Sequence, residues 1–385
     1  MRSPSESRAL VANPTPQPSG TAAPPSATPD PSGSAPAAKG TPAPSPPGAT
    51  GTPKPSAPAP DGKSTPPPPL NPRTVATEEA RARVTVPPSV ESSAGAGSPQ
   101  LSFKQMYGIH GRYQRGLSKA QIALNQVAMG RLEHGLALEM SRASFKTARL
   151  EGTGVAWGVW PNPKVWAPRH VDGTPDWFVA ICYRPGIARV FDLMSSTPAG
   201  WRLVASAADT QATPARLPKI ATDADGYATS LPENAPGLLA TPRQVAAAHL
   251  ASMAGAEPDP MFADGPWTSD VVQFWQQERA QLEEAGWTLR LSYRQEGPVR
   301  ALRTSDGGAL IWYAARSVDA RRAQRVGAKV SLKGSAAIRT ANKAFTHSVS
   351  ATYGRMYVAH VPPAGSTEPV RVLGEWSDVL ESHGD

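Results

Sequence analysis

The sequence predicts an α+β protein in which two tandem units, each with helices first and an antiparallel sheet after, follow a disordered proline-rich tail. The first observation is compositional: all 25 aromatic residues lie between Phe103 and Trp376, whereas 25 of the 43 prolines lie in the first hundred residues. The second is periodic: in the remaining 285 residues, the spacing of apolar residues changes twice from a helical three-to-four to an alternation of two.

Residues 1–100 offer too little apolar area to form a core. Consecutive prolines such as Pro66 to Pro69 stand among Ala, Ser, Thr and Gly. Burial of such residues does not offset the entropy of ordering the backbone, which costs roughly 1 to 2 kcal/mol per residue. We therefore expect this tail to be a disordered spacer, part polyproline II and part coil.

The first unit is expected over residues 101–230 and begins with helices. Apolar residues at spacings of three and four predict a helix near its start, at Met106, Ile109, Tyr113, Leu117, Ala120 and Leu124. A second helix is predicted over 132–150. Alternating residues then predict strands at 177–184, 188–195 and 201–206. Pro185-Gly186 marks the turn between the first two strands, and 153–170, with Trp157, Trp160 and Trp166, is expected as an irregular lead-in strand that buries its indoles.

The second unit is expected over residues 231–385, after a proline-punctuated boundary between residues 210 and 239. Thr241, Pro242 and Gln244 form a helix start, and Gly255 ends that helix. The next helix is predicted over 268–285. Strands follow at 288–294, 299–304, 309–316, 329–333, 344–351, 355–361 and 370–376. Asp306-Gly307-Gly308 is a strong hairpin signal.

The two units echo one another in sequence. The turn and strand PGIARVF at 185–191 corresponds to DGGALIW at 306–312. Helices followed by a meander of strands imply a sheet that wraps around its own helices. This order resembles the cone-shaped fold of nuclear transport factor 2, so the resemblance implies two such cones in tandem.

Four further stretches carry a second resemblance. They are IATDADGYAT at 220–229, FADGPWT at 262–268, ALRTSDGGAL at 301–310 and VPPAGS at 361–366. In this order they resemble a family of actinobacterial envelope proteins, of the kind found in Streptomyces, that is known only as a domain of unknown function. Many of its members resemble lipoproteins with a proline-rich spacer. The resemblance implies a cell-envelope or extracellular location, but no activity and no site residue.

The N-terminal residues predict a different location. The chain opens with Arg2, Ser3 and Pro4 rather than with an apolar leader and a lipid-attachment cysteine, and no run of 18 apolar residues occurs. Taken alone, these features predict a cytoplasmic protein without a transmembrane segment. Both locations stay open at this point.

The charge of the folded part does not favour nucleic acid as a partner. The net charge is +8 for the chain, and about two of those charges belong to the tail. The densest basic cluster is interrupted by Asp319 and lacks aromatic residues; it comprises Arg316, Arg321, Arg322 and Arg325. We expect it to be a solvated loop after a strand.

No residue pattern predicts a metal, a cofactor or a catalytic centre. The single cysteine, Cys182, lies in an apolar run and is expected to be a small buried hydrophobe. In Asp223-Ala224-Asp225-Gly226 the glycine comes at the fourth position, two places too early for a calcium loop, so a hydrogen-bonded turn is expected. The seven histidines show no metal-ligand spacing; they are His110, His134, His170, His249, His347, His360 and His383.

One histidine pair and the tryptophans remain candidates for function. His347 and His360 would face each other across a hairpin if its turn centred on Tyr353-Gly354, which makes them the best acid/base or metal pair in the sequence. The ten tryptophans are expected mainly in the core. Any exception would line a pocket at the mouth of a conical sheet.

These observations predict a non-enzymatic module, tethered in the envelope or secreted, that binds a partner protein or senses a small molecule. An enzyme that uses the cone cavity is the first alternative. A cytoplasmic scaffold protein is the second.

Overall fold

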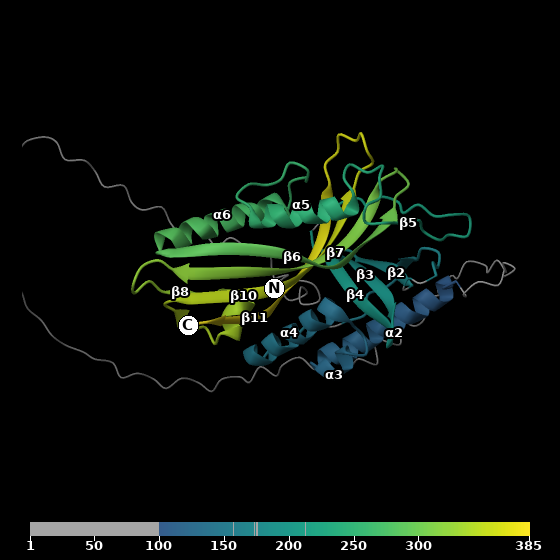
Figure 1. The fold of residues 1–385 in the computed structure, drawn as a ribbon. Coiled ribbons are helices and arrows are strands. Elements are labelled where there is room, and N and C mark those ends of the chain that lie inside the picture. Colours follow the sequence, from purple (N-terminus) through teal and green to yellow (C-terminus); the bar gives the residue numbers. More distant parts are fainter. Residues whose placement is uncertain (1–99, 157, 173, 175, 212) are drawn as a thin grey trace, which may run out of the picture. The chain divides into compact units, whose positions relative to one another are not determined.

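The computed structural model describes residues 100–156, 158–172, 174, 176–211 and 213–385 (Figure 1). The predicted disorder of the tail and the predicted burial of Trp157 lie outside the described residues. In the described part, helices precede strands twice, as the apolar periodicity indicates, but a short helix that the sequence did not predict, Gly334–Arg339, interrupts the second run of strands.

Capping boxes mark the start of two of the helices. The helices are α2 (Phe103–Ile122), α3 (Gln126–Met129), α4 (Gly135–Glu151), α5 (Pro242–Ala254), α6 (Ser269–Glu284) and α7 (Gly334–Arg339). A capping box of Ser102 and Gln105 starts α2. The predicted start of α5 is confirmed, because Thr241 and Gln244 form a second capping box and Pro242 is the first helical residue.

Nine strands form one antiparallel sheet with the order β1-β2-β3-β4-β11-β10-β7-β6-β5. Its strands are β1 (Lys164–Trp166), β2 (Trp177–Arg184), β3 (Ala188–Thr197), β4 (Gly200–Asp209), β5 (Ser230–Leu231), β6 (Trp287–Arg303), β7 (Ala309–Ala323), β10 (Ser348–Val361) and β11 (Arg371–Gly384). Two short strands, β8 (Val330–Ser331) and β9 (Ala344–Phe345), pair separately. The predicted hairpin at Asp306-Gly307-Gly308 joins β6 to β7, where Arg303 pairs with Ala309.

The prediction of two tandem cone domains is wrong, because a single sheet runs through both units. Strands β4 and β11 join at the pair Ala208 and Glu375. Gly374 permits this approach, since a Cβ there would lie 2.8 Å from the backbone of Ala208. Helix α4 packs on β4, β10 and β11, and so covers the join. The union also leaves neither β4 nor β11 as an unpaired edge.

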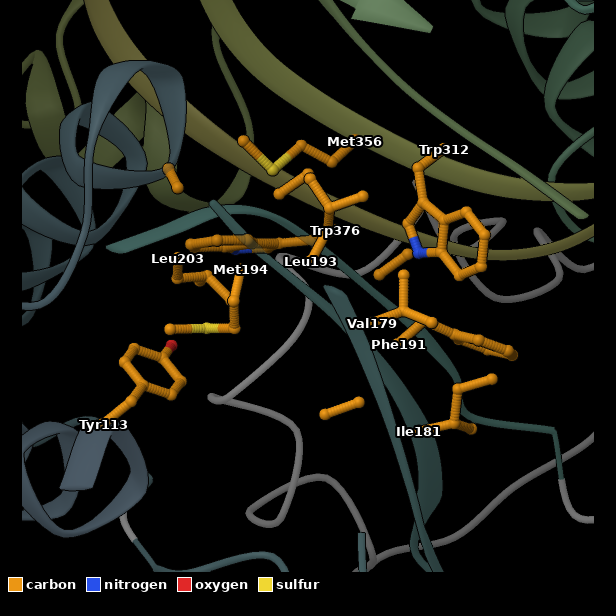
Figure 2. Close-up of a cluster of buried hydrophobic side chains, with 14 of the residues drawn as sticks. Tyr113, Val179, Ile181, Phe191, Leu193, Met194, Leu203, Trp312, Met356 and Trp376 are labelled. Atoms are coloured by element: carbon orange, nitrogen blue, oxygen red, sulfur yellow. The ribbon is translucent and has the colours of Figure 1, made fainter. Parts of the chain in front are cut away.

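The hydrophobic core confirms that the two halves are one structure. Its largest cluster combines residues of the first four strands with Trp312 of β7 and Trp376 of β11. Figure 2 shows part of this cluster, in which these two tryptophans lie with Phe191 and Leu193 of β3. Next to Trp312, Tyr313 belongs to the cluster beneath α5, because successive residues of a strand face opposite sides. Figure 1 shows α5 and α6 on one side of β6 and β7, and α4 on the other.

Two predicted interruptions of strands are absent. The segments predicted as separate strands at 288–294 and 299–304 form the single strand β6, which ends at Arg303 and absorbs Gly297-Pro298 as a bulge between Glu296 and Arg300. Tyr353-Gly354 is not a turn but the middle of β10. Gly354 stands there because α4 crosses closely: a Cβ on it would lie 2.5 Å from Cγ of Met140.

Candidate functional site

Two cavities in the described part lie around β3 and β4, and the larger one is at the start of α4. This α4 pocket has a volume of about 310 Å³. Its apolar walls come from both halves of the sheet and from α4, and include Leu136, Leu193, Val204, Ala205, Pro298 and Trp312. Its polar lining is His134, Ser195, Glu296 and Arg300. Both size and mixed lining suit a small organic ligand.

Arg300 is the unusual polar group of the α4 pocket. It is half-buried on β6, directly after the bulge, and pairs across the sheet with Trp312, so both side chains share the α4 side. Its guanidinium carbon lies 5.6 Å from the centre of the Trp177 ring. No described residue forms a hydrogen bond or ion pair with the guanidinium of Arg300. Burial lowers the pKa of Arg300, and the charge of Glu233 opposes that shift.

The N-terminus of α4 adds backbone donors to the same pocket. His134 is the N-cap residue, but its side chain makes no capping hydrogen bond, and the first turn contains no acidic residue. Gly135, which also lines the pocket, has a φ of +60°. Because the first amides of a helix lack partners within the helix, this end carries a partial positive charge.

Glu296, the acidic residue that lines the α4 pocket, belongs to a cluster of ion pairs with Arg294, Arg316 and Glu139, which lie outside the lining; we call these four residues the rim. The guanidinium of Arg316 on β7 lies 2.6 Å from Glu139 of α4 and 2.9 Å from Glu296 of β6. Arg294 also pairs with Glu296. These contacts join α4 to the bulged part of β6, so both carboxylates of the rim are already neutralised.

The smaller cavity, the α2 cavity, has a volume of about 40 Å³ and lies between α2, α4, β3 and β4. Asp192 accepts three buried hydrogen bonds beside it. Its carboxylate oxygens lie 2.9 Å from Nε2 of His110, 3.1 Å from Nε2 of Gln114 and 2.8 Å from Oγ of Ser206. Since Asp192 is a hydrogen-bond partner of all three buried groups, and Gln114 also lies 3.4 Å from Nε2 of His110, the network stabilises the fold.

Glu133 brings a second carboxyl group to the α2 cavity. Tyr113 donates a hydrogen bond of 3.3 Å to Oε1. Burial is the main reason that the pKa of Glu133 rises to about 8, while hydrogen bonds from Ser141 and Tyr113 oppose this shift. Glu133 therefore carries a proton at neutral pH. The next residue, His134, lines the α4 pocket, so one short segment touches both cavities.

The histidine pair that the sequence favoured does not come together. His347 precedes β10 and is exposed, whereas His360 lies buried near the other end of that strand. They cannot face each other, because the expected turn is part of a continuous strand. Nε2 of His360 lies 3.3 Å from Asp306, and burial lowers the pKa of His360.

Other expectations for single residues are confirmed. Cys182 is fully buried in a small apolar cluster. Asp223 accepts hydrogen bonds from the backbone of Asp225 and Tyr227, so this segment is a turn; its two carboxylates also pair with Arg169. Seven tryptophans are less than a tenth exposed, namely Trp160, Trp177, Trp267, Trp275, Trp287, Trp312 and Trp376.

The interpretation of the arginine cluster as a solvated loop after a strand is right for Arg325, which is exposed after the end of β7, and wrong for the other three arginines. Arg316, Arg321 and Arg322 lie on β7, which continues seven residues beyond the predicted end. Arg321 is buried, 2.8 Å from Asp319 and 3.1 Å from Glu278. The strand continues because these ion pairs make a buried position acceptable to arginine.

No pattern in the sequence pointed to Arg300, Asp192 or Glu133 as site residues. The sequence did contain one usable signal: His110 and Gln114 stand four residues apart on a helix and share the buried side of α2. Asp192 likewise interrupts an apolar strand. Arg300 gave no such signal, because its surroundings come from distant parts of the chain.

Residues 104–384 match the family described as Domain of unknown function (DUF8094). The chain belongs to this family. The match covers nearly all of the described residues, so both cavities lie inside the family's own domain. Neither the curated proteins nor the solved structures contain a match to this chain. Among the described residues, no helix is long and apolar enough to cross a membrane, and no group of three or more His, Cys, Asp and Glu is placed to hold a metal.

Proposed function

We propose that this chain is a non-enzymatic binding module that takes a small organic molecule into the α4 pocket. The single observation that carries the proposal is the pocket itself, with about 310 Å³ of space, apolar walls and an arginine that no described residue pairs. Pockets of this size with a few polar groups fix a ligand's orientation by those groups and bind it by apolar contact.

The experiment fills the pocket. Ala314 lines it on β7, so Ala314→Phe places a ring in the space that a ligand would occupy. Ala247→Phe on the exposed side of α5 is the matched control. A set of small organic fragments is screened on wild-type protein by thermal shift, and each binder is measured again by calorimetry. We expect binders that are lost in Ala314→Phe and kept in the control. A screen without binders, or binders that Ala314→Phe leaves unaffected, would refute the proposal.

We further propose that the module works in the actinobacterial cell envelope or outside the cell, with residues 1–100 as its spacer. The proline-rich composition of that stretch supports a spacer that keeps the folded part at a distance from its attachment. Fractionation of cells that express the native gene, followed by detection with an antibody, tests this location. Recovery from the cytosol alone would favour the cytoplasmic scaffold instead.

The second candidate function is an acid/base enzyme centred on the α2 cavity. It is favoured by Glu133, a carboxyl that keeps its proton to about pH 8 and could act as a general acid. The cavity of about 40 Å³ has room for a few water molecules rather than for a substrate. The test is turnover of ester and glycoside probes that Glu133→Gln abolishes without lowering the melting temperature.

A further inference from the structure

We propose that the α4 pocket selects organic carboxylates, with the carboxylate at Arg300 and the N-terminus of α4 and the apolar body against Trp312. This inference names the ligand class and rests on the proposed function of the pocket. Three features of the described residues carry it: a cation without a partner, a helix end without a cap, and a rim whose acids are already paired.

The first feature is the charge of Arg300. Its nearest acidic neighbour by charge is Glu233, but Glu233 is held elsewhere. The carboxylate of Glu233 lies 2.6 and 2.9 Å from two nitrogens of Arg243 and accepts the amide of Val299 at 2.9 Å. Arg300 therefore keeps its positive charge in a half-buried place without an ion-pair partner among the described residues, although the charge of Glu233 acts on it from a distance. A guanidinium there binds a carboxylate by two parallel hydrogen bonds.

The second feature is the N-terminus of α4, whose first residues line the pocket and whose backbone amides also favour an anion. Its cap residue, His134, uses its amide on the carbonyl of Leu203 and leaves the side chain free of any capping bond. A carboxylate would accept hydrogen bonds from the first-turn amides, as an acidic cap residue does in other helices. The pocket thus offers donors from a side chain and from the backbone.

The third feature is the balance of charge at the rim. Glu139 and Glu296 are its two acids, and Arg294 and Arg316 pair with them. Counting Arg300, the rim has three cations and two anions. The fixed charges therefore attract an anion and disfavour a cationic ligand.

The apolar walls determine the rest of the ligand. Leu193 and Val204 face the pocket from β3 and β4, and Trp312 faces it from β7. A volume of about 310 Å³ accommodates a body of one or two rings, or a short chain. An anion without an apolar body would leave these walls exposed to water, so the pocket favours monocarboxylates over inorganic anions.

The experiment compares charged and neutral probes of the same shape. Benzoate and hexanoate are titrated against benzamide and hexanamide by calorimetry, with the indole NMR signal of Trp312, assigned by Trp312→Phe, as the local readout. We expect each carboxylate to bind at least about tenfold more tightly than its amide, since a hydrogen bond to a charged group is worth that much.

Two variants locate the carboxylate. Arg300→Gln should weaken benzoate binding at least about tenfold, whereas Arg290→Gln, an exposed arginine on the same strand, should change it less than twofold. His134→Asp caps α4 with its own carboxylate and should lower affinity without lowering stability. His134→Asn supplies a neutral cap and should lower affinity less.

The outcomes separate the two proposals. Equal binding of amides and carboxylates, with Ala314→Phe still abolishing both, would overturn the selection of carboxylates and leave the binding function standing. Benzoate affinity unchanged in Arg300→Gln would overturn the placement at Arg300. If none of the four probes binds, the selection of carboxylates is wrong, and the fragment screen decides the binding function separately. If the probes bind but Ala314→Phe changes nothing, the pocket is not the site and the inference falls with the function.

Discussion

The two cavities differ in how their polar groups are used. Asp192 in the α2 cavity accepts hydrogen bonds from His110, Gln114 and Ser206, all of them buried. Arg300 in the α4 pocket has only the face of Trp177, with no described acceptor for its guanidinium. A satisfied buried network stabilises a fold, whereas an unsatisfied one reduces stability and is available to a ligand. We therefore infer that the polar groups of the α2 cavity stabilise the fold, whereas those of the α4 pocket are available to bind a ligand.

The strongest test of this comparison is to separate the halves of the sheet. The α4 pocket takes walls from both halves, and the α2 cavity needs Trp376 of β11. We expect residues 101–230 and 231–385, expressed separately, to lack a cooperative thermal transition, because each exposes its part of one shared core. Residues 101–385 serve as the control. Cooperative unfolding of both halves would show that the cavities belong to independent units.

The next largest effect is expected from Asp192. Asp192→Leu leaves three buried polar partners without an acceptor and should reduce the free energy of unfolding by about 3 to 5 kcal/mol. Asp172→Asn is the control, because the side chain of Asp172 is 93% exposed and should cost less than about 0.5 kcal/mol. Urea denaturation measures both. A small effect at Asp192 would mean that the network is not structural.

Glu133 should make stability depend on pH. Its pKa rises from 4.5 to about 8 on folding, so between these values the folded state binds more protons than the unfolded state. The stability contributed by the protonated carboxyl is therefore complete below about pH 4.5 and is lost as the pH rises through 8. Relative to wild type, Glu133→Gln should gain about 3 kcal/mol of stability between pH 5 and pH 8.

Other buried groups titrate in the same range, so the comparison with Glu133→Gln must be made at each pH. Asp378, whose pKa burial raises to about 7, acts in the same direction. His249, whose pKa burial lowers to about 4, acts in the opposite direction, since its unfolded form binds protons up to about pH 6.5. A difference between variant and wild type that stays constant with pH would contradict the assignment to Glu133.

The smallest effect is expected from Arg300. Arg300→Gln removes a half-buried cation without an ion-pair partner and loses the contact with Trp177 and the attraction of Glu233, so the change in unfolding free energy should stay within about 1 kcal/mol. Urea denaturation beside Arg290→Gln measures it. A loss of 3 kcal/mol or more would place Arg300 with Asp192 among the structural residues and would remove the contrast between the cavities.

Local patterns in the sequence determined the elements. The strand predicted at 177–184 and the helix start at Thr241 are confirmed, because alternation and capping depend on neighbouring residues. The burial of Cys182 and of most described tryptophans followed from composition. Signals within one element were also sufficient to show polar residues on the buried side of α2, although their partner on β3 could not be inferred.

Contacts between segments far apart in the sequence determined how the strands pair and where the α4 pocket lies. Gly354 reads as a turn in sequence, yet it stands in mid-strand because α4 crosses there. Gly374 lets β11 approach β4 closely, and because these two strands pair, the two expected domains share one sheet. The α4 pocket exists only because this union brings α4 to the bulge that carries Arg300. Periodicity indicates which face of an element is apolar, but it does not indicate which strand will pair with it. The position of the α4 pocket depends on that pairing, because its walls come from both halves of the sheet.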